Sequence, residues 1–163
     1  MKACIIYVMG VSGSGKTTIG EKLAARLGWP FFDGDDFHSP SNKKKMNLGI
    51  PLTDEDRKDW LLQMNHAARE HAKQGAVLAC SALKEKYRTI LSSGITIPLY
   101  WVLLQGSFEV IKKRMDARKD HFMPASLLSS QFDALEIPGN CIMIDISNNP
   151  DEIVEKIVSQ IKY

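Results

Sequence analysis

A glycine-rich stretch near the start of the chain carries the residue types that bind phosphate groups. Residues 10–18 read Gly-Val-Ser-Gly-Ser-Gly-Lys-Thr-Thr and match the phosphate-loop pattern G-x-x-x-x-G-K-[ST]. The apolar run 3–9 precedes the motif and a helical apolar pattern follows it up to Gly28, a context that an ordinary Gly/Ser-rich turn lacks. In this context Lys16 reaches the β- and γ-phosphates of a nucleotide and the Thr17 hydroxyl binds Mg²⁺. We therefore expect a nucleoside triphosphate to contact the whole stretch, Gly10, Val11, Ser12, Gly13, Ser14, Gly15, Lys16, Thr17 and Thr18.

Two carboxylates separated by one residue follow the second predicted strand, residues 29–33. Phosphoryl transfer requires a carboxylate near the metal or the attacking hydroxyl, and cations over the transferring group. We assign Asp35 to proton acceptance and substrate binding, and Asp33 together with Thr17 to the metal; the reverse division of the two carboxylates is the alternative. The non-catalytic interpretation is an acidic turn that caps the next helix, and Asp36 fits capping or solvent exposure better than catalysis.

Two pairs of basic residues have the four-residue spacing that brings side chains to one face of a helix. Arg114 and Arg118 precede a polar segment that could close over a nucleotide. The pair resembles the lid arginines of nucleoside-monophosphate-type kinases, which implies that both bind the nucleotide and makes Arg118 a candidate for catalysis. Lys84 and Arg88 follow the third predicted strand and could receive an anionic or polyhydroxylated substrate. For either pair, an exposed basic helix face is the alternative interpretation.

Two histidines in predicted loops, His38 and His121, are candidates for hydrogen bonds to substrate hydroxyls. Neither has the spacing to another His or Cys that a zinc site requires, so we do not expect zinc.

The predicted elements alternate between strands and helices along the whole chain. Strands are expected at residues 3–9, 29–33, 76–80, 97–104 and 141–146. Helices are expected after the phosphate loop and at residues 41–46, 53–73, 84–91, 107–118, 126–135 and 151–162. This order predicts an α/β fold of three layers, with a five-stranded parallel sheet between helices. Ligands of such folds bind at the carboxyl ends of the strands, where the candidate residues gather.

Composition restricts the class of protein further. With 163 residues, we expect one domain spanning residues 1–163. The formal net charge of +2 is too small to indicate a nucleic-acid surface, and no apolar stretch has membrane-spanning length. Cys4, Cys80 and Cys141 lie in separate apolar runs without a C-x-x-C motif, which predicts buried thiols in a reducing compartment. We therefore expect a cytoplasmic protein without nucleic-acid or membrane partners.

Several further motifs, taken together with the phosphate loop, resemble the gluconate kinase (gluconokinase) family of P-loop small-molecule kinases. They cover nearly the whole chain and comprise Asp33-Gly-Asp-Asp-Phe-His38, Asn42…Lys45-Met46, Gly49-Ile-Pro-Leu-Thr-Asp-Glu-Asp-Arg57, Cys80-Ser-Ala-Leu-Lys84…Tyr87-Arg88, Arg118-Lys-Asp-His-Phe-Met123 and Ser130-Gln-Phe-Asp-Ala-Leu-Glu-Ile-Pro138. The resemblance implies a P-loop kinase fold, ATP-dependent phosphorylation of D-gluconate to 6-phosphogluconate, a Mg²⁺ requirement, a homodimer and a lid at about residues 115–125. It places substrate contacts at Asp33, Asp35, His38, Arg57, Ser81, Lys84, Arg88 and His121.

Two departures from the family pattern bear on these expectations. Lys119-Asp120 stands where family members often have a glycine, which affects the expected lid rather than the reaction. The third strand ends in Cys80-Ser81 without the acidic residue of a Walker B strand, so metal binding depends more on Thr17 and Asp33.

Other kinases of this fold are the nearest alternatives. Adenylylsulfate kinases share Asp-Gly-Asp after the second strand, and shikimate kinases have Asp-x-Asp there. The continuation Phe37-His38-Ser-Pro40 and the segment 80–84 favour gluconate. A guanine-specific switch would show Asn-Lys-x-Asp, which is missing, whereas a nucleotide-binding module without catalysis stays open as an alternative.

Overall fold

The computed structural model describes residues 1–118 and 124–161, and their central element is a sheet of parallel strands. Its strands are β1 (Ile5–Met9), β2 (Phe31–Asp33), β3 (Ala76–Ala79), β4 (Leu99–Gln105) and β5 (Ile142–Asp145). They pair in the order β2-β3-β1-β4-β5, with every neighbouring pair parallel. The described residues therefore form the predicted five-stranded parallel sheet.

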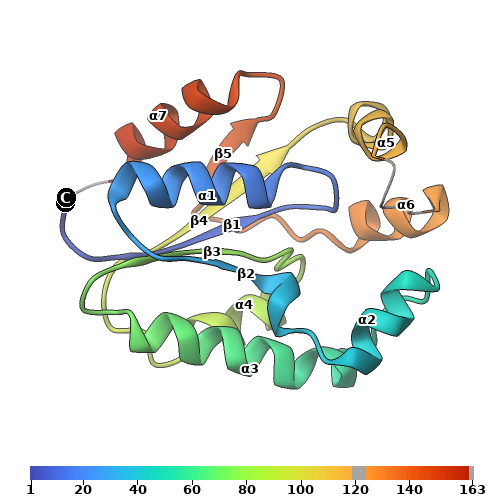
Figure 1. Cartoon of the computed structure of the whole chain (residues 1–163), viewed down its shortest axis with the longest axis horizontal. Coiled ribbons are helices and arrows are strands. Elements are labelled where there is room, and N and C mark those ends of the chain that lie inside the picture. The colour runs from blue at the N-terminus through green and yellow to red at the C-terminus, as the bar shows by residue number, and fades with distance from the viewer. Residues whose placement is uncertain (119–123, 162–163) are drawn as a thin grey trace.

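Helices cover both faces of the sheet (Figure 1). They are α1 (Lys16–Leu27), α2 (Pro40–Asn47), α3 (Asp54–Glu70), α4 (Glu85–Ser92), α5 (Phe108–Asp116), α6 (Ala125–Ala134) and α7 (Pro150–Gln160), with a short 3-10 helix, η1 (Gly34–Phe37). In Figure 1, α1 and α7 lie above the sheet and α3 and α4 lie below it. Helix α2 on one side and α5 and α6 on the other flank the end of the sheet where the strands finish. This is the predicted three-layer arrangement.

Strand β1 divides the hydrophobic core into two clusters because successive side chains of a strand point to opposite faces. Ile6 and Val8 belong to the cluster under α1 and α7. Ile5, Tyr7 and Met9 belong to the cluster between the sheet and helices α3 and α4. All five side chains are fully buried, as expected for the central strand of a parallel sheet.

Local signals in the sequence predicted most elements correctly and a few incorrectly. Thr53 and Asp56 form the capping box that opens α3. The helix ends at Glu70 instead of residue 73, because a turn precedes Gly75. Helix η1 was not predicted. Cys4 and Cys80 are buried, but Cys141 is only half-buried, so that part of the prediction was wrong; all three thiols are free.

None of the helices in the described residues combines the length and the apolar character that crossing a membrane requires.

Candidate active site

The loop between β1 and α1 is shaped to receive an anion. Gly15 precedes α1 with φ of 95°, and no side chain caps the first N–H groups of this helix. Gly13 has φ of 79°, and a Cβ there would lie 2.6 Å from Cγ of Met115, so both its conformation and its packing favour glycine. The Ser14 hydroxyl is buried and makes no hydrogen bond to the described residues. Uncapped N–H groups, a helix N-terminus and an unpaired hydroxyl fit the phosphates of a nucleotide.

The side chain of Lys16 lies within this loop, where its Nζ donates a hydrogen bond to the Val11 carbonyl at 3.1 Å. Burial lowers the pKa of Lys16, and the nearby Asp35 and Asp33 carboxylates partly offset this effect. The positive charge of Arg118 adds to the lowering of the same pKa. The two carboxylates therefore favour the charged form of the Lys16 side chain.

Asp33 accepts hydrogen bonds with both carboxylate oxygens. Its Oδ2 accepts from the Thr17 hydroxyl at 2.6 Å, and its Oδ1 accepts from the Asp35 N–H at 2.9 Å. The second bond caps η1, as the non-catalytic interpretation of this acidic turn expects. The same residue, Asp33, is the one that we assign to the metal. The side-chain oxygens of Thr17, in the phosphate loop, and of Asp33, at the end of β2, are therefore in direct contact.

No group of three or more His, Cys, Asp or Glu side chains in residues 1–118 and 124–161 could hold a metal ion. A pair such as Thr17 and Asp33 is enough for Mg²⁺, because this ion is usually bound by one or two protein oxygens together with substrate phosphates and waters.

Trp60 of α3, a residue that the sequence analysis did not single out, fixes the backbone between the two aspartates. The Trp60 indole Nε1 donates to the buried Gly34 carbonyl at 2.6 Å. A Cβ at Gly34 would lie 2.6 Å from the Ala79 carbonyl oxygen, so the turn packs directly on β3. Trp60 therefore acts on the position of Asp33 and Asp35 through the backbone.

His38 stacks on the face of the same indole. Its ring is stacked on Trp60 with centroids 4.1 Å apart, and its Nδ1 lies 3.5 Å from the Asn42 amide nitrogen. Burial, with contributions from Arg57 and Lys43, lowers the pKa of His38 to about 4, so the ring is neutral at pH 7. A neutral imidazole in this position has hydrogen-bonding capacity without charge.

Arg57 is held by residues from two neighbouring elements. Its Nη1 donates to the Leu52 carbonyl and, at 3.2 Å, to the Tyr87 hydroxyl. The Tyr87 hydroxyl in turn donates to Oδ1 of Asp54 at 2.6 Å. Hydrogen bonds from Lys86 and Tyr87 lower the pKa of Asp54 to about 2. This network connects the start of α3 to α4 and orients Arg57.

The loop after β3 lies beside the phosphate loop, because the Ser81 carbonyl accepts a hydrogen bond from the Gly10 N–H at 3.4 Å. Lys84 follows as the half-buried N-cap residue of α4. Arg88 is only 5% exposed, and its Nη1 donates to the Ala82 carbonyl at 2.7 Å. Burial lowers the pKa of Arg88. The structure thus places Arg88 beneath this loop, where it supports Ala82, which has an unusual φ of 45°.

The predicted nucleotide-binding arginines lie at the opposite side of the phosphate loop. Arg114 donates to the Ile146 carbonyl at 2.8 Å, just after β5, and Arg118 is exposed after α5. His121 lies outside the described residues, as do residues 119–123 of the expected lid.

A further residue at the phosphate loop was not singled out from the sequence. Gln131 of α6 makes two hydrogen bonds to Ser12, one to its N–H and one to its hydroxyl. The only signal was its place in the segment 130–138 that carries the family resemblance.

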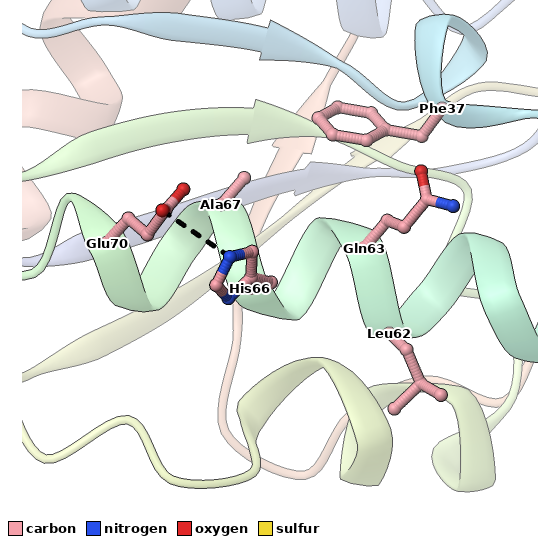
Figure 2. Close-up of a pocket in the computed structure, with 6 residues that line it drawn as sticks. All are labelled: Phe37, Leu62, Gln63, His66, Ala67 and Glu70. Atoms are coloured by element: carbon pink, nitrogen blue, oxygen red, sulfur yellow. Dashed lines mark ion pairs between the residues drawn. The ribbon is translucent and has the colours of Figure 1, made fainter.

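A shallow pocket lies away from these residues, on the outer side of α3 next to η1 (Figure 2). It is lined by Phe37, Leu62, Gln63, His66, Ala67 and Glu70. Only His66 and Glu70 form an ion pair there, at 3.4 Å, and none of the predicted site residues lines the pocket. The candidate site is therefore the carboxyl edge of the sheet.

Comparison with known proteins agrees with this geometry. A family model described as shikimate kinase matches residues 12–162. The chain is 47% identical to a probable gluconokinase from Dictyostelium discoideum, over 97% of this chain and 86% of that protein. It is 45% identical to a gluconokinase from Gluconobacter oxydans, with 97% and 91% of the two chains covered. The chain belongs to the gluconokinase family. The crystal structure of a gluconokinase from Sinorhizobium meliloti has a TM-score of 0.86 and 42% identity to this chain, and the match covers 97% of this chain and 90% of that one. The gluconokinase relationship and the P-loop kinase fold, both predicted from the motifs, are confirmed.

Proposed function

We propose that this chain is a kinase that transfers the γ-phosphoryl group of ATP to a hydroxyl of D-gluconate, giving 6-phosphogluconate and ADP. The observation that carries the proposal is the hydrogen-bonded arrangement of Thr17, Asp33 and Asp35 beside the phosphate loop, in a chain that belongs to the gluconokinase family. Phosphoryl transfer depends on positioning and on charge stabilisation, and these residues supply both.

The hydrogen bonds of Asp33 support a division of roles between the two aspartates. Both of its oxygens accept hydrogen bonds, which fixes that carboxylate next to Thr17. We assign Asp33 and Thr17 to Mg²⁺, which when bound neutralises charge on the phosphates. Asp35 then takes the proton of the attacking hydroxyl. The oxygen of that hydroxyl bonds to the γ-phosphorus, and the bond between the γ-phosphorus and the oxygen bridging it to the β-phosphate breaks.

The remaining residues bind and orient. Lys16 gives up its bond to the Val11 carbonyl and turns to the phosphates, where Arg118 adds positive charge. We assign Arg114 to the nucleotide. The acceptor is held from the opposite side by Arg57 and neutral His38, whose orientations are fixed by their contacts, and by Lys84, while buried Arg88 acts by supporting the loop that carries Ser81.

The first experiment measures ADP release with MgATP against a panel of acceptors: D-gluconate, shikimate, adenylylsulfate, AMP and none. We expect release only with D-gluconate. Lys16→Ala should reduce turnover by about 10²-fold or more, because a positive charge on the transferring group is lost. ADP release with another acceptor would overturn the assignment of D-gluconate as the substrate. Tight ATP binding without ADP release under any condition would favour a nucleotide-binding module without catalysis.

We further propose a homodimer in the cytoplasm, without nucleic-acid or membrane partners, as the family resemblance and the small net charge indicate. Light scattering coupled to size-exclusion chromatography measures the molar mass, and a monomer mass would contradict the dimer.

A further inference from the structure

Helix α6 presents a side-chain amide to the phosphate loop. The Gln131 Oε1 accepts a hydrogen bond from the Ser12 N–H at 2.8 Å, and the Gln131 Nε2 donates to the Ser12 hydroxyl at 3.1 Å. Both partners are partly buried, and they are 119 positions apart in the sequence. A two-point contact to one residue fixes both the position and the rotation of that part of the loop.

The helix that carries Gln131 is itself anchored in the core. Leu128 is 1% exposed, and the ring of Phe132 packs edge-on against Phe108 of α5, with centroids 5.7 Å apart. Gln131 therefore projects from a fixed support.

The segment that follows α6 contacts the other side of the site. The Glu136 N–H donates to the Leu83 carbonyl at 2.7 Å, and Oε2 of Glu136 accepts from the Glu85 N–H at 2.8 Å. The second bond satisfies an N–H at the start of α4, where the N-cap Lys84 makes no side-chain hydrogen bond. Glu136 therefore holds the end of the loop that carries Ser81 and Lys84.

We propose that Gln131 and Glu136 are positioning residues through which one segment, residues 125–136, holds the phosphate loop and the acceptor loop (residues 81–85) in a fixed relation. Gln131 acts through Ser12 on the nucleotide side. Glu136 acts through Leu83 and Glu85 on the acceptor side. Only five positions separate them, so the spacing between the two reactant sites is set by a short, anchored piece of chain.

The expected effects differ between the two positions. Gln131→Met keeps the approximate volume of the side chain and removes both hydrogen bonds to Ser12. Loss of these two bonds should raise KM for MgATP by about 5- to 30-fold, while KM for the acceptor changes by less than about twofold. Glu136→Met should show the opposite pattern, and Glu136→Gln, which keeps an acceptor oxygen for the Glu85 N–H, should largely restore KM for the acceptor.

The experiment measures both KM values and kcat for the wild type and these variants, with Ser130→Ala as the matched control. Ser130 is exposed on the same helix and bonds only to the Leu127 carbonyl among the described residues, so the control should behave as the wild type. Circular dichroism confirms that each variant is folded. Calorimetry with a non-hydrolysable ATP analogue, without any acceptor, tests Gln131 separately.

The acceptor half of this proposal rests on the proposed gluconate phosphorylation, whereas the nucleotide half does not. If the wild type fails to use gluconate, the calorimetric comparison still decides the role of Gln131. Combining Gln131→Met with Ser12→Ala should cost less than the sum of the two single changes. Additive losses, equal changes in both KM values, or a folded Gln131→Met variant with wild-type nucleotide affinity would overturn the proposal.

Discussion

Trp60→Phe tests whether the two aspartates are positioned through the backbone between them. The indole N–H bonds to the Gly34 carbonyl at 2.6 Å, and its ring is stacked on His38 at 4.1 Å. Phenylalanine keeps an aromatic ring in the core and has no donor. The Gly34 carbonyl would then be buried without this partner.

The expected loss of stability follows from the chemistry of that carbonyl. The Gly34 carbonyl keeps its i→i+3 bond within η1, so the change removes one hydrogen bond, which contributes about 0.5–1.5 kcal/mol. With an unfolding entropy of about 2.1 cal/mol/K per residue over 163 residues, this corresponds to a decrease in Tm of about 1–4 °C. The turn that holds Asp33 and Asp35 also loses its anchor. Misplacement of reacting groups by about 1 Å costs up to 10²-fold, so we expect kcat to fall by about 10- to 100-fold.

The assay combines thermal unfolding with ADP release in the presence of saturating substrates. Trp101→Phe is the matched control, since Trp101 stacks on Tyr7 with centroids 4.8 Å apart and a phenylalanine ring can keep that contact. The control should retain kcat. If Trp60→Phe lowers Tm as expected and leaves kcat unchanged, the proposed positioning of the aspartates is refuted.

Three further predictions address individual groups. Asp35→Asn should lower kcat by about 10²- to 10⁴-fold without loss of nucleotide affinity. A near-normal kcat in the ADP-release assay would mean that Asp33, and not Asp35, is the proton acceptor. Thr17→Ala should shift the Mg²⁺ titration of activity to about 10-fold higher concentration or more, and an unchanged titration would remove Thr17 from the metal site. His38, whose pKa is lowered from 6.5 to about 4, binds fewer protons in the folded than in the unfolded protein between these pH values, so stability should fall as the pH falls through that range. Tm measured from pH 7 to 4 should show a shallower slope for His38→Gln than for the wild type, and equal slopes would contradict the burial of His38.

The fold could be predicted because its signals are local and repeated. Alternating strands and helices after a phosphate loop specify a parallel sheet, and the capping box at Thr53 located the start of α3 closely. Helix η1 was missed because four residues carry no hydrophobic period, and the turn forms where the Asp33 side chain accepts from the Asp35 N–H. The end of α3 was placed too late because no strong stop signal precedes Gly75.

The reacting groups could be proposed because parallel strands bring their carboxyl ends to one edge. Lys16 comes after β1 and Asp33 ends β2, and the Asp33 carboxylate accepts a hydrogen bond from Thr17, the neighbour of Lys16. Arg88 shows the limit of spacing arguments. Its four-residue spacing from Lys84 places both on one helix turn, but packing directs the Arg88 guanidinium to the Ala82 carbonyl inside the protein.

The three positioning residues contact the backbone of the site loops from positions well separated in the sequence. Trp60 binds a carbonyl oxygen, and Gln131 and Glu136 each accept from a backbone N–H of a site loop. A backbone atom is present whatever side chain its residue carries, so such a contact imposes little on the sequence of the loop and produces no motif within it. The contact is decided by how α3 and α6 pack on the sheet, a property of distant core residues. Variants at these three positions leave every reactive residue in place and change only the support of the site. They therefore test how far the rate of phosphoryl transfer depends on the geometry of the structure.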